Sequence, residues 1–376
     1  MIEYQVASSE EEHRVHEALL VECCEQRDAG RALVSPLTRF GFSGAKLYRI
    51  YFGERDTRPY VGKIHSWRKL NDEHSRSQQV RHHFAVQEST FVDLDPDGDD
   101  VNRLTMLLYP LVEGGSDEAG QIAELGDIFF DPTNPSGASD ALEMVYDSAS
   151  SPLGRAKPAI KKGEFGEVLE RYFRDEDAEA SLNSVFGRNE TITGFDGIPL
   201  TNPMVLRSRL GGTYDFHHSP VHGDLHAQNV LLDRLGNPHL IDYAWADAEG
   251  PTAIDYTVME ATIRLMRFPH TCNPSTLIRV QALLNEDFPR LALGREEALL
   301  ESDPMRSTYV RAAKLVDRIR TGFRRVCGNT SHDEYLLALF ATLYGMVAYR
   351  DYPLLPTLHV LNSIAGEIDP ELAPSS

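Results

Sequence analysis

Short apolar runs separated by turn residues fill the first third of the chain. Residues 47–51 and 59–64 form two such runs on either side of a turn-like segment, and they predict a β-hairpin. Before this hairpin, residues 10–27 place apolar side chains at helical intervals among charged ones. This periodicity predicts an amphipathic helix that packs onto the main fold as an addition.

The chain after the hairpin predicts one polar helix and one further strand. The helix covers residues 69–84, and Asn71 or Asp72 can cap its N-terminus. The strand is the apolar run at residues 104–111, which Pro110 interrupts and two glycines follow. Because Pro and Gly end strands and begin loops, we expect a connector between two lobes at this point.

Helical periodicity dominates the chain from residue 253 onward. The most apolar stretch, residues 335–349, is shorter than the roughly 20 residues that span a bilayer, so it predicts a buried helix. Strands first and helices afterwards describe an α+β fold, with a small antiparallel sheet lobe ahead of a larger, mainly helical lobe. The expected divisions are an N-terminal helical extension (1–30), an N-lobe (31–110) and a C-lobe (111–376).

The net charge of the chain limits the classes of partner that we expect. A net charge of −20 repels phosphate backbones, so we expect no nucleic-acid partner, and a cationic substrate would be favoured. Acidity that only keeps the protein in solution is the alternative. The N-terminal residues have neither a basic segment nor an apolar run, and no segment predicts a membrane span, so we expect a cytoplasmic protein without a membrane contact.

Three polar residues in the segment VHGDLHAQNVLLDRLGNPHLIDY, residues 221–243, have spacings that suit one site. Asp224 and Asn229 are close enough in sequence for one loop to aim both into a cleft. Two apolar runs, VLLD and HLID, flank a turn signal and predict a hairpin. That hairpin would return Asp242 to the neighbourhood of Asn229.

Phosphoryl transfer requires these residue types. One carboxylate must orient the attacking hydroxyl and accept its proton, and oxygen ligands must hold the Mg²⁺ that bridges the phosphates. Asp224 suits the first role as the catalytic base, and Asn229 and Asp242 suit the second as metal ligands.

The motifs HGDLHAQN and LIDY resemble the catalytic and metal-binding motifs of the aminoglycoside phosphotransferase and choline kinase branch of the protein-kinase-like superfamily. The resemblance implies a bilobal protein-kinase-like fold, with ATP and Mg²⁺ as cofactors. It also implies that Asp255, which opens a later helix, braces the catalytic loop. We expect His222 to be structural, whereas His226 stands where protein kinases carry a phosphate-contacting lysine.

The N-terminal half resembles the same branch at its phosphate loop. In FGFSGAKLYRI, residues 40–50, Gly41, Ser43 and Gly44 precede a strand and let backbone amides approach phosphates. The resemblance implies that Lys63 on the next strand pairs with the α- and β-phosphates.

A lysine on an apolar strand needs a carboxylate partner. Glu73 on the predicted helix is the best candidate, with Asp72 beside it and Glu88 as a distant alternative. For adenine, the resemblance implies backbone groups of the connector, represented by Tyr109 and Leu111, whose side-chain identity would matter little.

These features predict an ATP-dependent phosphotransferase that acts on a hydroxyl of a small molecule. The sequence also resembles phosphotransferase-like domains of bacterial conflict and signalling systems, which leaves a protein or nucleotide acceptor and a protein partner open. A non-catalytic ATP-binding module is a third alternative, although the base and both metal ligands are retained.

Overall fold

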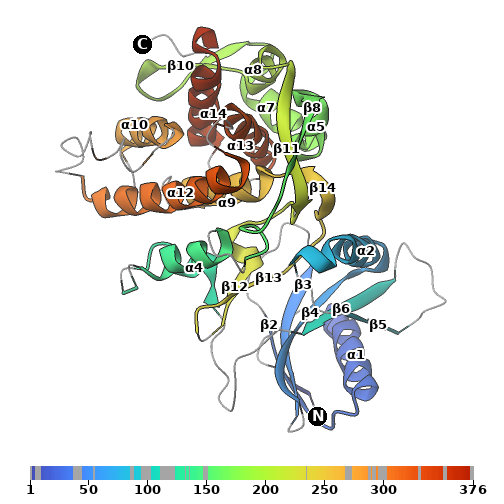
Figure 1. Ribbon diagram of the computed structural model, residues 1–376. Coiled ribbons are helices and arrows are strands. Elements are labelled where there is room, and N and C mark those ends of the chain that lie inside the picture. The colour runs from blue at the N-terminus through green and yellow to red at the C-terminus, as the bar shows by residue number, and fades with distance from the viewer. Residues whose placement is uncertain are drawn as a thin grey trace. The chain divides into compact units, whose positions relative to one another are not determined.

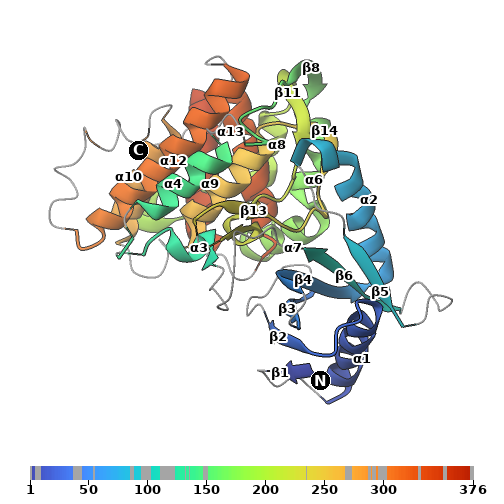
Figure 2. The ribbon, with the colours of Figure 1, turned by 60° about the horizontal axis from the view of Figure 1, so that its bottom comes forward.

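The computed structural model describes seventeen stretches of the chain, which divides into two compact units, shown in Figures 1 and 2. The described residues are 2–4, 10–36, 45–53, 56–84, 89–94, 103–110, 123–131, 133–134, 136–146, 151–233, 235–266, 273–286, 289, 294, 303–328, 332–349 and 354–372, with breaks between them. Unit 1 contains residues 1–123 and 231–247, and unit 2 contains residues 124–230 and 248–376.

Unit 1 is built on a six-stranded sheet. Its strand order is β1-β2-β3-β4-β6-β5, and every neighbouring pair except β1 with β2 is antiparallel. The predicted hairpin is confirmed, because β3 and β4 pair directly. The strands are β1 (Ile2–Tyr4), β2 (Ala32–Pro36), β3 (Lys46–Phe52), β4 (Asp56–Ser66), β5 (Thr90–Asp93) and β6 (Leu104–Pro110).

Two helices cover the two faces of this sheet. On β6, Met106 and Leu108 pack in a cluster with buried side chains of α1 (Glu10–Gln26). Leu107 and Tyr109, which alternate with them, pack against α2 (Trp67–Phe84). Since successive strand residues point to opposite faces, α1 and α2 lie on opposite sides of the sheet. The N-terminal helix is therefore part of the core of unit 1.

The start of α2 differs from the prediction. The helix begins at Trp67, before both proposed capping residues, Asn71 and Asp72. The N–H group of Trp67 donates to the carbonyl of Arg103 at 2.8 Å, and the Arg103 guanidinium lies 4.5 Å from the centre of the Trp67 ring. The first residue of α2 is therefore in contact with the residue that precedes β6.

A second hairpin completes unit 1. Strands β12 (Val230–Leu232) and β13 (Pro238–Leu240) are neighbours, with β7 (Ala123–Glu124) beside β12, which confirms the hairpin predicted from VLLD and HLID. Leu231 and Ile241 pack in one cluster with Val61 of β4. The predicted C-lobe was continuous from residue 111, whereas these contacts group residues 231–247 with the N-terminal sheet.

Unit 2 is mainly helical. Helix α9 (Ile254–Met266) lies against α12 (Arg306–Cys327) and α13 (His332–Met346), and α12 also contacts α4 (Gly137–Tyr146), as Figure 2 shows. All residues of α13 from Glu334 to Met346 are buried, which confirms a buried helix within the apolar stretch. No helix among the described residues is long and apolar enough to cross a membrane.

The remaining elements surround this helical core. Strand β11 (Thr213–Val221) lies between β8 (Ala159–Glu164) and β14 (Asp247–Pro251). The predicted α+β class, with a mainly antiparallel sheet first and a larger helical part afterwards, is confirmed. The other elements are α3 (Leu125–Ile128), α5 (Phe165–Val168), α6 (Glu170–Phe173), α7 (Asp175–Phe186), β9 (Thr191–Thr193), β10 (Pro199–Thr201), α8 (Pro203–Arg209), α10 (Pro274–Asn285) and α14 (Leu354–Ile368).

Candidate active site

A buried lysine with two carboxylate partners forms the polar centre of unit 1. Strand β4 carries Lys63, which is only 3% exposed. Its Nζ atom lies 2.7 Å from Oε2 of Glu73 on α2 and 2.7 Å from Oδ2 of Asp242, which follows β13. The structure therefore brings together the predicted lysine, its predicted helical partner and one predicted metal ligand.

The charges at this centre are strongly coupled. Burial lowers the pKa of Lys63, but the carboxylates of Glu73 and Asp242 outweigh that effect and hold the pKa above its usual value. Burial raises the pKa of Glu73 to about 7 and the charge of Asp242 adds to the increase, while Lys63 and Tyr109 oppose it. The charge of Lys63 therefore limits the increase in the pKa of Glu73, so that the buried carboxylate is partly ionised at neutral pH.

Asp242 has an uncommon backbone conformation. Its φ of 66° lies in the left-handed region, which residues other than glycine adopt uncommonly, although Asn and Asp do so more often than the rest. The next residue, Tyr243, is buried, and the centre of its ring lies 6.0 Å from the centre of the Phe84 ring at the end of α2. Such strained residues concentrate at functional sites, where the surrounding packing maintains them.

Tyr109 contributes its side chain as well as its backbone. The sequence predicted only a backbone contact to adenine, but the Tyr109 hydroxyl donates a hydrogen bond to Oε1 of Glu73. The adenine contact stays a prediction. The other predicted nucleotide contacts, Gly41, Ser43, Gly44 and Leu111, lie outside the described residues.

The predicted catalytic loop belongs to unit 2 and follows β11. Asp224 has a side chain that is 27% exposed, and its Oδ2 lies 3.8 Å from Nε2 of His226. The Asn229 side-chain amide donates to the backbone carbonyl of Asp224 at 2.8 Å. This bond uses the amide nitrogen of Asn229, and the side-chain oxygen is the atom that could act as a ligand.

A buried aspartate holds the start of this loop. The two carboxylate oxygens of Asp255 accept the N–H groups of His222 at 2.8 Å and Gly223 at 2.7 Å. Burial raises the pKa of Asp255 to about 7, although both N–H bonds oppose the increase. Gly223 has a φ of 83°, which glycine adopts readily. The bracing role that the resemblance implied for Asp255 is consistent with this geometry.

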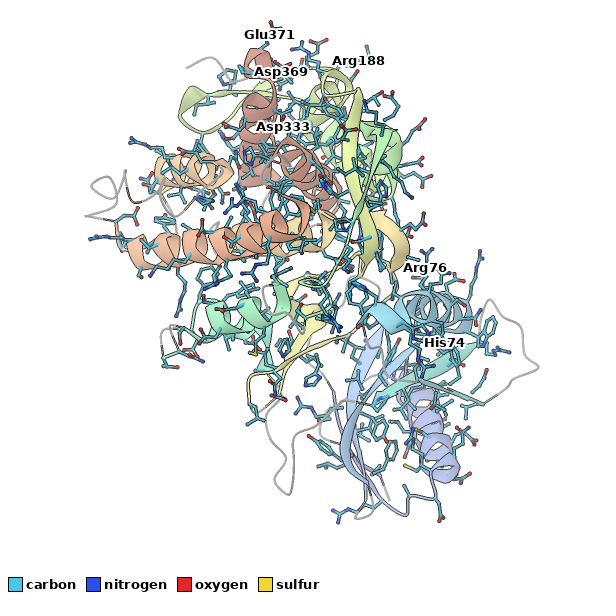
Figure 3. All side chains as sticks on the ribbon, in the orientation of Figure 1. His74, Arg76, Arg188, Asp333, Asp369 and Glu371 are labelled. Carbon is cyan, nitrogen blue, oxygen red and sulfur yellow. The ribbon has the colours of Figure 1, made fainter. Side chains whose placement is uncertain are left out.

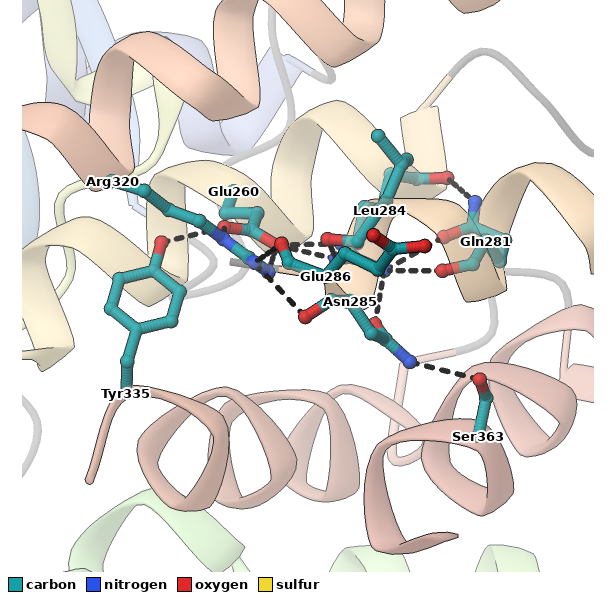
Figure 4. Close-up of polar contacts among 9 residues, drawn as sticks. Glu260, Gln281, Leu284, Asn285, Glu286, Arg320, Tyr335 and Ser363 are labelled. Atoms are coloured by element: carbon teal, nitrogen blue, oxygen red, sulfur yellow. Dashed lines mark hydrogen bonds and ion pairs between the residues drawn. The ribbon is translucent and has the colours of Figure 1, made fainter. Parts of the chain in front are cut away.

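Helix α9, which carries Asp255, is anchored by a fully buried ionic network, shown in Figure 4. Glu260 pairs with Arg264 of the same helix and with Arg320 of α12, and it accepts the Tyr335 hydroxyl at 2.6 Å. The two guanidinium groups also donate to acceptors on and just after α10, at Gln281, Leu284, Asn285 and Glu286. Sequence reasoning missed this network, because Arg320 and Tyr335 are 60 and 75 positions away from Glu260.

The described candidate residues therefore fall into two parts, one in each unit. Unit 1 holds Lys63, Glu73, Tyr109 and Asp242 in mutual contact, and unit 2 holds the loop with Asp224 and Asn229. The chain passes from the second part to the first between residues 230 and 231. The amide oxygen of Asn229 and the carboxylate of Asp242 are each hard oxygen donors of the kind that Mg²⁺ prefers.

A comparison with protein families identifies a family that matches residues 154–344 of the chain. The family described as ternary complex associated domain 9 matches residues 154–344, just over half of the sequence. This region includes the predicted catalytic loop and Asp242. A comparison with curated proteins found no match.

Several solved structures are similar to the chain at low sequence identity. A glucosamine kinase structure has 14% identity and a TM-score of 0.41, over 94% of this chain and 86% of its own. The aminoglycoside phosphotransferase APH(4)-Ia has 14% identity and a TM-score of 0.35, over 89% of this chain and 99% of its own. The choline kinase LicA from Streptococcus pneumoniae has 14% identity and a TM-score of 0.34, over 80% and 98%.

Proposed function

This chain belongs to the ternary complex associated domain 9 family, and we propose that it is a phosphotransferase that uses Mg²⁺ and ATP to phosphorylate a hydroxyl group of a small molecule. The observation that carries the proposal is the buried Lys63, whose Nζ atom contacts both Glu73 and Asp242 at 2.7 Å. This lysine is buried and is held in place by a carboxylate of α2 and by a candidate metal ligand. Such a cation is suited to bind the phosphate groups of ATP.

Asp224 is the residue that would handle the proton. Its side chain is partly exposed, so a substrate hydroxyl can reach its carboxylate. In the proposed step the hydroxyl oxygen forms a bond to the γ-phosphorus as the bond from that phosphorus to the ADP oxygen breaks. The hydroxyl proton passes to Asp224, and ADP leaves with the bonding electron pair.

Asn229 and Asp242 are the residues that would hold the metal. When bound, Mg²⁺ neutralises charge on the phosphate oxygens during transfer. The bond from Asn229 to the Asp224 carbonyl fixes the amide plane, so the ligand and the base are positioned by the same loop. Asp255 in turn holds the beginning of that loop.

The acceptor class follows from charge and from the proposed base. Asp224 needs a neutral hydroxyl group whose proton it can accept, and the net charge of −20 attracts cations. We therefore propose hydroxyl-bearing amines as the first acceptors to test.

A second candidate function is phosphotransfer to a protein within a larger assembly. The family description, ternary complex associated, favours this alternative because it implies partner proteins. Both functions use the same nucleotide site and the same base, so they differ only in the acceptor.

The test is transfer of label from ATP in the presence of Mg²⁺. The purified chain is incubated with γ-labelled or α-labelled ATP, with and without a panel of hydroxyl-bearing amines, beside Asp224→Asn and Asp177→Asn. Asp177 is an exposed residue of α7 and serves as the matched control. We expect γ-label transfer to fall about 10²- to 10⁴-fold in Asp224→Asn only.

The acceptor of the label separates the candidates. Label on a small amine supports the first function, and label on a protein supports the second. Transfer of α-label would show that the nucleotide is moved instead of the phosphate. Nucleotide binding without Asp224-dependent turnover, in the presence and absence of candidate partner proteins, would contradict both functions and support a binding module.

A further inference from the structure

The Glu73 carboxylate is shared between two side chains from neighbouring strands. Its Oε2 atom lies 2.7 Å from Lys63 Nζ on β4, while its Oε1 atom accepts the hydroxyl of Tyr109 on β6. Lys63 pairs with Leu107 across the sheet, and Tyr109 pairs with Val61. Tyr109 and Lys63 therefore lie diagonally on the sheet face that α2 covers.

Burial makes both carboxylate oxygens dependent on partners. Glu73 is 2% exposed, so water cannot replace a missing hydrogen bond without opening the core. A buried oxygen that is left without a donor destabilises the folded state. The lysine satisfies one oxygen, and the tyrosine hydroxyl satisfies the other.

The Tyr109 ring is itself held rigidly. It is 7% exposed and packs with Leu70 of α2, Leu107 of β6 and Phe91 of β5. A tyrosine has only two side-chain torsions, whereas a glutamate has three. A packed ring therefore offers a fixed point to which the more flexible carboxylate can bind.

We propose that Tyr109 is a positioning residue, whose hydroxyl holds Glu73 so that the carboxylate keeps Lys63 in its phosphate-binding position before nucleotide arrives. The proposal rests on the proposed function as far as nucleotide is concerned. It assigns to the Tyr109 side chain a role that differs from any backbone contact to adenine.

Independent contacts already hold α2 against the sheet. Nδ1 of His74 lies 2.9 Å from Oγ of Ser89, and its ring meets the Phe91 ring edge to face at 5.1 Å. Figure 3 shows His74 on α2. Removal of the Tyr109 hydroxyl should therefore loosen Glu73 and its helical turn without unfolding the helix.

The test compares Tyr109→Phe with a matched loss of a hydroxyl elsewhere in unit 1. Tyr48 on β3 has its hydroxyl 2.8 Å from Nδ1 of His16, on the face that α1 covers. Tyr48→Phe therefore removes a hydrogen-bonded phenol hydroxyl that does not touch Glu73. Glu73→Gln and the double variant of positions 73 and 109 complete the set.

Two measurements are made. In the nucleotide-free protein, we expect amide hydrogens of α2 to exchange faster in Tyr109→Phe than in wild type, and unchanged in Tyr48→Phe. In Mg-ATP titrations, we expect Tyr109→Phe to weaken binding about tenfold, the size of one hydrogen bond to a charged group. The double variant should bind no more weakly than Glu73→Gln alone, because Tyr109 acts through Glu73.

The outcomes distinguish the two proposals. Equal exchange of α2 in wild type and Tyr109→Phe would overturn the positioning role, whether or not nucleotide binds. Additive losses of affinity in the double variant would also overturn it. Absence of nucleotide binding in wild type would contradict the proposed function, and the exchange measurement would then decide the role of Tyr109 alone.

Discussion

The N–H group of Gly223 donates a 2.7 Å hydrogen bond to Oδ1 of Asp255, although the two residues are 32 positions apart in the sequence. Asp255 lies in the first turn of α9 and is fully buried. The backbone that precedes Asp224 is therefore held by a helix in the core of unit 2.

Asp255→Ala should lower the free energy of unfolding by about 2–5 kcal/mol. The change removes the acceptors of two buried N–H groups, at His222 and Gly223. Denaturant unfolding measures the loss, and Asp177→Ala on an exposed helical position is the control. A loss below about 0.5 kcal/mol, as at an ordinary surface position, would show that the loop does not depend on Asp255.

Glu260→Gln should destabilise the protein by about 3–5 kcal/mol at pH 7, because it leaves two buried guanidinium groups without their carboxylate. Burial alone would raise the pKa of Glu260, but the charges of Arg320 and Arg264 together outweigh burial and lower this pKa to about 2. The charged carboxylate therefore stabilises the fold above its unfolded pKa of 4.5, and this contribution is lost as pH falls toward 2.

Unfolding measured between pH 7 and pH 3 checks the assignment. The difference in stability between wild type and Glu260→Gln should shrink as pH falls below 4.5. Glu143→Gln breaks an exposed pair with Arg318 and should change stability by less than about 1 kcal/mol. A difference for Glu260→Gln that is constant with pH would contradict an ionised Glu260.

Lys63→Met should make the stability of the protein more sensitive to alkaline pH. The wild-type pKa of Glu73 is about 7, above the usual 4.5, and loss of the lysine charge raises it further. Folded Lys63→Met then keeps the Glu73 proton at pH values where the unfolded chain has released it. The free energy of unfolding therefore falls as pH rises from the unfolded pKa of 4.5 to the raised folded pKa.

The measurement is unfolding at pH 6 and pH 8. We expect the drop between these values to be about 1 kcal/mol larger in Lys63→Met than in wild type. Lys69→Met, at an exposed position of α2, should behave like wild type. Parallel pH profiles for all three proteins would argue against a buried Lys63–Glu73 pair.

Gly345→Ala should destabilise unit 2, although alanine is the better helix former. A Cβ atom at Gly345 of α13 would collide with the backbone carbonyl oxygen of Tyr172 on α6, which cannot move as a side chain can. We expect a loss of more than about 1 kcal/mol, typical of overpacking. Gly166→Ala, where the added carbon meets open space, is the thermal-unfolding control, and equal melting temperatures would refute the close approach.

Local sequence patterns were sufficient for the features that short-range geometry controls. The hairpin of β3 and β4, the hairpin of β12 and β13, and the buried helix α13 follow from apolar runs and turn residues. Lys63 and Glu73 are ten positions apart, so a strand followed directly by a helix can bring them together. Their pairing was predictable for that reason.

Tertiary structure alone decided which distant residues complete these parts. Tyr109 reaches Glu73 across 36 positions because β6 pairs with β4 in one register, and the sequence pattern does not encode that register. The N–H group of Trp67, the first residue of α2, donates to the carbonyl of Arg103, which is 36 positions away and precedes β6, so local capping signals did not identify this helix start. Spacing along the chain determines what one turn or one hairpin can join, whereas pairing of strands and packing of helices determine the partners of Glu73, Asp255 and Glu260.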